Sequence, residues 1–152
     1  MTALHKKEAL FKACEDQLAA KYAIVQNKIK GIVTSLNDAT KSSAGDKHET
    51  TRAMLQLERE QAGERLQEIE KTQAVLYKIN AIHRSKTAHL GSLVTTNQGI
   101  FFLSISLGVL QIENCNYFCI GLQTPIGRLL FGKQAGDTFV FRDTNYTIVS
   151  ID

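Results

Sequence analysis

Two acidic residues stand close together near the middle of the chain. Asp46 and Glu49 belong to the segment from Gly45 to Glu49. Their carboxylates can supply oxygen ligands to a hard cation, or Asp46 can cap a following helix while Glu49 reaches back, as in a capping box. Both interpretations are open, and we interpret His48 between them as a solvated loop residue.

The three cysteines form no recognisable metal motif. Cys115 and Cys119 are four positions apart in a predicted strand and therefore share a face. A structural zinc site needs four ligands, and neither a second pair nor a nearby histidine is present. An odd number of cysteines without a tight pairing pattern predicts free thiols and a reducing compartment, so we expect the cytoplasm.

Two segments with heptad patterning flank the acidic pair. Apolar residues recur in the first at alternating spacings of four and three, which is typical of a coiled-coil seam. The seam residues of the first segment are Leu18, Tyr22, Val25, Ile29, Ile32 and Leu36. Those of the second are Leu55, Arg59, Ala62, Leu66, Ile69, Gln73 and Leu76.

The two segments predict an antiparallel helical hairpin. Residues at the same height in such a hairpin have numbers with a constant sum, and here facing pairs such as Ile29 and Ala62 add up to 91. Half of that sum falls at the Gly45–Asp46 bond, so the tip is predicted within residues 42–49. The helices would extend about 45 Å at roughly 1.5 Å per residue. Such a rod is either a dimerisation arm or spacer, or a probe that delivers its tip into a narrow place.

Beyond Ala81 the periodicity changes from helical to strand-like. The predicted strands are Ser92 to Thr96, Phe101 to Val109, Tyr117 to Ile120, Thr138 to Arg142 and Tyr146 to Ile151. Alternation predicts that the second of these is half-buried. Turns are predicted at residues 97–99 and 143–145.

One short helix is predicted within the strand-rich part. Thr124 can cap it, Pro125 suits the first helical position, and Gly132 can end it. The chain is therefore predicted to be α+β. An N-terminal antiparallel coiled-coil hairpin (residues 1–84) precedes a small antiparallel sheet with one short helix (residues 85–152).

Composition limits the other possibilities. With 152 residues and 43% hydrophobic content, the chain can bury one modest core and carry one extension. The apolar run from Gly99 to Leu110 is too short to span a bilayer, and residues 1–10 contain no apolar signal core. Residues 1–86 carry fifteen Lys and Arg against eleven Asp and Glu. A basic rod is compatible with approach to nucleic acid and equally with an ordinary solvated coiled coil.

Several motifs together resemble the Gre-type transcription elongation factors of bacterial RNA polymerase. The segment from Thr124 to Lys133, followed by Gly136 and Asp137, resembles their C-terminal signature. Gly91 to Val94 resembles the start of the same domain, and Tyr146 to Ile151 resembles its final strand. Gly45 to Glu49 matches the Gly-Asp-x-x-Glu motif at the tip of their coiled coil. The motifs cover nearly the whole chain in the family's order and spacing.

The resemblance implies a fold and a function. Gre factors dock an FKBP-like C-terminal domain at the mouth of the polymerase secondary channel, and their coiled coil runs down that channel. The acids at its tip help to hold a second Mg²⁺ ion and a water, which stimulates cleavage of backtracked RNA. By this resemblance Asp46 and Glu49 are the catalytic and metal-binding positions.

The same resemblance implies the partners. It assigns docking on the polymerase to five residues: Thr124, Pro125, Ile126, Gly127 and Arg128. The chain would be an accessory factor, not an enzyme, with no cofactor of its own and Mg²⁺ shared with the polymerase. Its partners would be bacterial RNA polymerase and the nascent RNA 3′ end near the tip. We expect a monomer with no membrane association.

Three alternatives stay open. Lys47 adds a positive charge beside the acids where the family usually has an apolar residue, so a regulator or inhibitor could occupy the channel without stimulating cleavage. A peptidyl-prolyl isomerase would need a pocket lined by aromatic residues, most of which strand alternation assigns to ordinary core. A coiled-coil adaptor without polymerase involvement is the third alternative.

Overall fold

The computed structural model describes residues 2–41 and 45–152, and for residue 40 and residues 45–48 it describes the backbone alone. The chain divides into two compact units, which are described separately. One consists of Met1–Asp16 together with Ala74–Asp152, and the other of Gln17–Gln73. The sequence places a boundary between residues 84 and 85, whereas contacts assign both ends of the helical region to the unit that contains the sheet.

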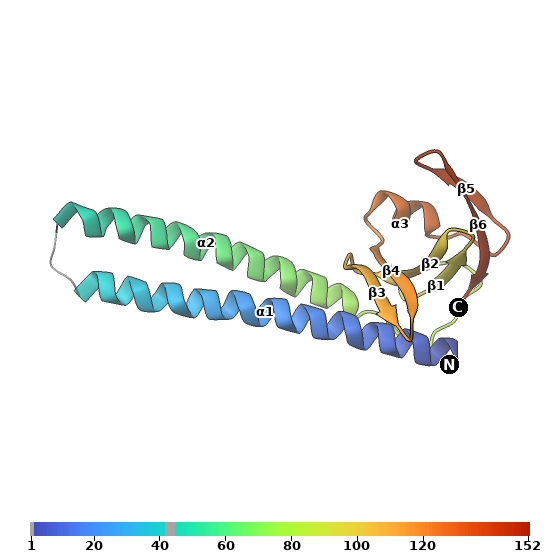
Figure 1. Cartoon of the computed structure of the whole chain (residues 1–152), viewed down its shortest axis with the longest axis horizontal. Coiled ribbons are helices and arrows are strands. Elements are labelled where there is room, and N and C mark those ends of the chain that lie inside the picture. The colour runs from blue at the N-terminus through green and yellow to red at the C-terminus, as the bar shows by residue number, and fades with distance from the viewer. Residues whose placement is uncertain (1, 42–44) are drawn as a thin grey trace. The chain divides into compact units, whose positions relative to one another are not determined.

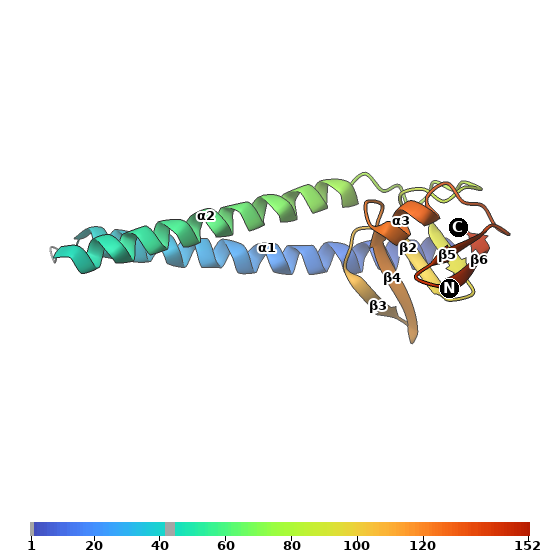
Figure 2. The same cartoon turned by 90° about the horizontal axis from the view of Figure 1, so that it is seen from above.

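The second unit consists of the larger parts of two long helices that lie side by side, α1 (Ala3–Lys41) and α2 (Gly45–Leu76) (Figures 1 and 2). The first part of α1 and the last residues of α2 belong to the other unit. The predicted seam is confirmed by burial. Within the second unit, the apolar side chains that are at most 5% exposed are Leu18, Val25, Ile32 and Ala62. The seam positions between them are half-buried, except Arg59, whose side chain is exposed. The heptad pattern therefore identified the face on which the helices meet.

The contacts across this seam fit the predicted register. The Tyr22 hydroxyl donates a hydrogen bond to the Glu70 carboxylate at 3.5 Å. Glu70 follows Ile69, which the constant sum places opposite Tyr22. Farther along, Ile29 and Gly63 line one surface groove from opposite helices. Both observations place facing residues within one position of the predicted pairing.

The predicted midpoint of the hairpin falls inside a helix. The first helix ends at Lys41 and the second already begins at Gly45, so the Gly45–Asp46 bond lies inside α2. The constant sum gives the middle of the turn only if the two helices end at the same height along the hairpin. Here α2 begins earlier in the sequence than that condition requires. Of the predicted tip, residues 42–44 lie outside the described residues.

The other unit contains a six-stranded sheet with the strand order β3-β4-β2-β1-β6-β5. Its strands are β1 (Leu93–Thr96), β2 (Gly99–Ser104), β3 (Gly108–Ile112), β4 (Cys115–Gly121), β5 (Thr138–Phe141) and β6 (Thr144–Ile151). The α+β class is confirmed, but the sheet is mixed and not purely antiparallel, because β2 and β4 are parallel. The chain reverses direction twice, before and after β3, so β4 returns to the direction of β2.

The predicted strand from Phe101 to Val109 is in fact two strands, β2 and β3. Gly108 adopts a φ of 77° where the chain turns between them, a conformation that glycine tolerates without strain. The predicted half-burial of this segment is also wrong. All four residues from Phe101 to Ser104 are buried, because β2 lies inside the sheet and is covered on both faces.

Side chains on the two faces of β2 pack into two different buried layers. Phe101 and Leu103 belong to a core cluster with Leu130 of α3 (Pro125–Leu130). On the opposite face, Phe102 is fully buried. It pairs in register with Cys119 of β4, whose sulfur contacts the first part of α1. The described portions of the chain contain no helix that is long and apolar enough to cross a membrane.

The seam register can be tested by crosslinking. In a protein whose three native cysteines are replaced by alanine, we expect Ile29→Cys and Ala62→Cys to form a disulfide under mild oxidation. The two positions face each other, and a disulfide requires Cβ atoms about 4 Å apart. Non-reducing electrophoresis and mass spectrometry measure the crosslink.

The matched control pairs Ile29→Cys with Ile69→Cys, one heptad and about 10 Å farther along the same seam. This pair should stay reduced in the monomer. Equal crosslinking of both pairs, or of the control pair alone, would contradict the register.

Candidate functional site

The two predicted acidic residues lie in the first turns of α2. Asp46 is the second residue of this helix and Glu49 follows three positions later. The backbone of Asp46 is described but its side chain is not, whereas the Glu49 side chain is exposed. A capping box would require Asp46 to precede the first helical residue. Gly45 already belongs to α2, but the Asp46 side chain lies outside what the structure describes, so the capping interpretation stays a prediction.

The helix N-terminus gives this location an electrostatic preference. The unpaired backbone N–H groups of a first helical turn carry partial positive charge, which favours a carboxylate there. The oxygen chemistry of Asp46 and Glu49 suits Mg²⁺, but this ion takes about six ligands in near-octahedral geometry. Among the side chains that the structure describes, which do not include those of Asp46 and His48, no group of three or more metal-ligating residues comes together. The pair could thus supply only part of a coordination shell.

The predicted docking residues surround the start of α3, in the other unit. Thr124 is the N-cap residue, and its side-chain oxygen accepts a hydrogen bond from the Gly127 backbone N–H at 3.1 Å. Its hydroxyl also donates to the Gly121 carbonyl at 2.8 Å. Pro125 occupies the first helical position, as predicted. The Thr124 side chain is therefore committed to holding the helix end against β4.

Gly127 has a steric reason to be glycine. A Cβ atom at this position would collide with the Gly121 carbonyl oxygen and lie 2.8 Å from the Thr124 hydroxyl. The Gly127 backbone N–H donates to the Thr124 side chain, and its carbonyl accepts from the Phe131 backbone N–H. The close approach of α3 to β4 thus depends on the missing side chain.

The solvent-facing residues of this segment are different ones. Pro125 and Arg128 are exposed, whereas Ile126 is only partly exposed and packs against the core cluster. Phe131, the C-cap residue of α3, is 54% exposed. Sequence analysis missed Phe131, although Leu130 beside it points inward and a helix turns about 100° per residue. Pro125, Arg128 and Phe131 are the side chains that a partner could contact.

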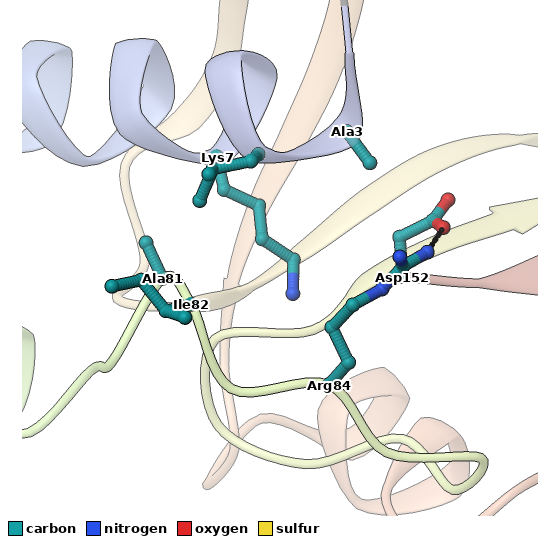
Figure 3. A pocket seen from close by; sticks show the side chains of 7 residues that line it. Ala3, Lys7, Ala81, Ile82, Arg84 and Asp152 are labelled. Atoms are coloured by element: carbon teal, nitrogen blue, oxygen red, sulfur yellow. Dashed lines mark hydrogen bonds and ion pairs between the residues drawn. The ribbon is translucent and has the colours of Figure 1, made fainter.

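A pocket of about 230 Å³ lies near the start of α1 (Figure 3). The Lys7 ammonium points into it and donates to the His83 carbonyl at 3.4 Å, while Arg84 forms an ion pair with Asp152 at 3.0 Å. Burial lowers the pKa of Lys7, and the nearby Asp152 carboxylate partly opposes this shift. The sequence pattern gave no signal for this cluster, because its residues are far apart along the chain.

Four aromatic residues of the sheet pack against one another. Phe101 stacks on Phe118 with ring centroids 5.3 Å apart, and Phe139 stacks on Tyr146 at 4.9 Å. Phe101 and Phe139 belong to the core cluster, and their partners pack against it. This arrangement gives the peptidyl-prolyl isomerase alternative no support.

No family model matches the chain, and neither the curated proteins nor the solved structures include a significant match. Any functional assignment therefore depends on the motifs and on the arrangement of their residues.

The steric role of Gly127 predicts a stability effect. We expect Gly127→Ala to lower the free energy of unfolding by about 2–4 kcal/mol, because the added methyl meets backbone that cannot move without breaking the α3 cap. Thermal or denaturant unfolding monitored by circular dichroism measures the change.

Gly63→Ala serves as the control with the opposite sign. Gly63 lies in α2 with no atom near its absent Cβ, so alanine should raise stability by about 0.5–1 kcal/mol through helix propensity. A Gly127→Ala protein as stable as the wild type would refute the steric account of α3.

Proposed function

We propose that this protein is a Gre-like factor that binds bacterial RNA polymerase at its secondary channel and stimulates cleavage of backtracked RNA. The observation that carries the proposal is the position of the Gly-Asp-x-x-Glu motif. It falls at the end of a long two-helix rod, with Asp46 and Glu49 in the first turns of α2. An exposed acidic helix end on such a rod suits delivery of carboxylates into a confined site.

The chemistry proposed for the tip is incomplete without a partner. Asp46 and Glu49 would each contribute oxygen ligands to a Mg²⁺ ion whose other ligands come from the polymerase and the RNA. Bound there, that ion would supply the second metal of a two-metal phosphodiester cleavage. The protein itself would orient its two carboxylates and bring negative charge to the ion, and would perform no reaction alone.

The docking surface proposed for the polymerase is the outer side of the α3 segment. Arg128 and Phe131 combine an exposed cation with an exposed aromatic ring, which are residue types that often dominate binding energy. Thr124 and Gly127 would support this surface by fixing the helix end, and Ile126 by packing beneath it. The proposed contact is thus narrower than the five residues that the resemblance implies.

Lys47 favours one alternative within the same class. A cation directly beside Asp46 would weaken the local field that attracts Mg²⁺. A protein of this kind could occupy the channel and regulate the polymerase without stimulating cleavage.

The cleavage proposal predicts a specific loss. With a stalled, backtracked elongation complex, we expect Asp46→Asn to reduce stimulated transcript cleavage on the order of 100-fold and Glu49→Gln to reduce it less, with polymerase binding unchanged. The neutral amides keep the shape but lose the charge that holds the ion, which is worth several kcal/mol in the transition state. Electrophoresis of end-labelled RNA across a Mg²⁺ titration measures cleavage.

Asp143→Asn and Glu58→Gln, two exposed residues elsewhere, are the matched controls and should cleave like the wild type. If the wild-type protein binds the complex but leaves cleavage at its intrinsic rate at every Mg²⁺ concentration, the non-cleaving regulator replaces the proposal.

The docking proposal predicts a separate loss. We expect Arg128→Glu and Phe131→Ala each to weaken binding to core RNA polymerase about tenfold or more, because both remove exposed contacts of the types that act as hot spots. Fluorescence anisotropy of labelled protein measures affinity, and circular dichroism verifies folding.

Arg142→Glu reverses an exposed cation in the turn between β5 and β6, and Val149→Ala removes an exposed apolar side chain from β6. They should bind like the wild type. Unchanged affinity in both α3 variants would exclude this segment from the interface.

A further inference from the structure

Two cysteines that are far apart in the sequence lie in contact within the unit that contains the sheet. Cys14 belongs to α1 and Cys119 to β4, and their sulfur atoms are 3.9 Å apart. Both residues are free thiols with no exposed surface. The sequence gave no hint of this pair, because 105 positions separate its members.

The pair lies in a buried, mainly apolar layer between α1 and the sheet. Leu10, Leu76 and Phe102 are fully buried in the same unit. The Ser104 hydroxyl, also buried, donates to the Phe102 carbonyl at 3.4 Å and is close enough to influence both thiols. The surrounding buried side chains hold the two sulfurs together and slow the access of solutes to them.

The two sulfurs are in van der Waals contact. Sulfur atoms in a disulfide are about 2.05 Å apart, so the two sulfurs must approach each other by less than 2 Å. Rotation about the Cα–Cβ bonds can supply part of this movement. Cys115, only partly exposed, instead lies beside the Tyr117 hydroxyl.

We propose that Cys14 and Cys119 form a reversible dithiol–disulfide pair that hydrogen peroxide oxidises, linking the first part of α1 covalently to β4. This inference is independent of the polymerase proposal. Oxidation would tether residues 3–16 to the sheet and close a loop of more than one hundred residues.

The reaction proceeds in two balanced steps. The Cys14 thiolate attacks one peroxide oxygen, the O–O bond breaks, and the departing hydroxide takes a proton to form water, which leaves a sulfenic acid on Cys14. The Cys119 sulfur then attacks the Cys14 sulfur, the S–O bond breaks, and the hydroxide leaves as water with the Cys119 proton. In total the two thiols lose two protons and two electrons, and peroxide is reduced to two water molecules.

The environment assigns the attacking thiol. The hydrogen bond with the Cys119 thiol lowers the pKa of Cys14, while the same interaction and burial raise the pKa of Cys119. These directions favour Cys14 as the thiol that attacks peroxide. Because neither sulfur is exposed, peroxide must reach the pair during local opening of the α1 packing, and that opening sets the rate.

The test uses the full-length folded protein. After treatment with excess hydrogen peroxide, the sample is denatured, alkylated and digested with chymotrypsin, which can cleave after Tyr117 or Phe118 and so separates Cys115 from Cys119. We expect a crosslinked peptide pair containing Cys14 and Cys119, a mass loss of two hydrogens, and faster migration on a non-reducing gel that dithiothreitol reverses.

Variants identify the partners. Cys115→Ser should keep the fast-migrating form, whereas Cys14→Ala and Cys119→Ala should abolish it. The oxidised wild type should also melt at a higher temperature than the reduced protein, because the closed loop restricts the unfolded chain. If either alanine variant fails to fold, peptide mapping of the Cys115→Ser protein decides the question alone.

Three results would overturn the proposal. The first is that Cys14 and Cys119 remain fully alkylatable after peroxide treatment while Cys115 is oxidised. The second is that either buried cysteine accumulates as sulfinic or sulfonic acid. The third is a disulfide that includes Cys115.

Discussion

The positions of the tip residues depend on the apolar seam between α1 and α2. Val25, Ile32 and Ala62 are nearly solvent-free, whereas Ile24, Met54 and Leu57, away from the seam, are more than half exposed. Fully burying a large aliphatic side chain stabilises the folded state by about 1.5–3 kcal/mol. Because the seam is narrow, few such side chains hold the two helices together. The register of that seam determines which residues reach the end of the rod. It therefore also determines where Asp46 and Glu49 are presented.

A different constraint shapes the α3 segment. Thr124 and Gly127 are committed to internal hydrogen bonds and close packing, which leaves Pro125, Arg128 and Phe131 to face solvent. A single short motif thus combines residues that keep the helix end in place with residues that a partner could contact. Sequence alone does not separate these groups, because both occur within one turn of helix.

The parts of the fold that were predictable are those with a local cause. Heptad spacing identified the buried face of α1 and α2, and capping chemistry identified α3 from Thr124 and Pro125. The division of the Phe101–Val109 segment depends on Gly108 in a left-handed conformation, which an alternating pattern does not reveal.

Long-range pairing accounts for what was not predictable. The parallel partnership of β2 with β4 and the contact of Cys14 with Cys119 both join segments that no local pattern connects. The candidate acids were identified by type and spacing, but the start of α2 at Gly45, which places Asp46 inside the helix, required the structure. The exposure of Phe131 was not predictable either, because residue type alone does not reveal the direction of a side chain.

The most direct test of the central claim is site-specific photocrosslinking from the tip. A photoreactive amino acid at position 49 is activated in a stalled elongation complex whose RNA carries a label at its 3′ end, with the same substitution at exposed Val149 for comparison. The proposed function predicts that position 49 crosslinks to the RNA 3′ end or to the polymerase catalytic centre and that position 149 does not. Crosslinks from position 49 only to the outer surface of the polymerase, or to no component of a complex that the protein demonstrably binds, would contradict it.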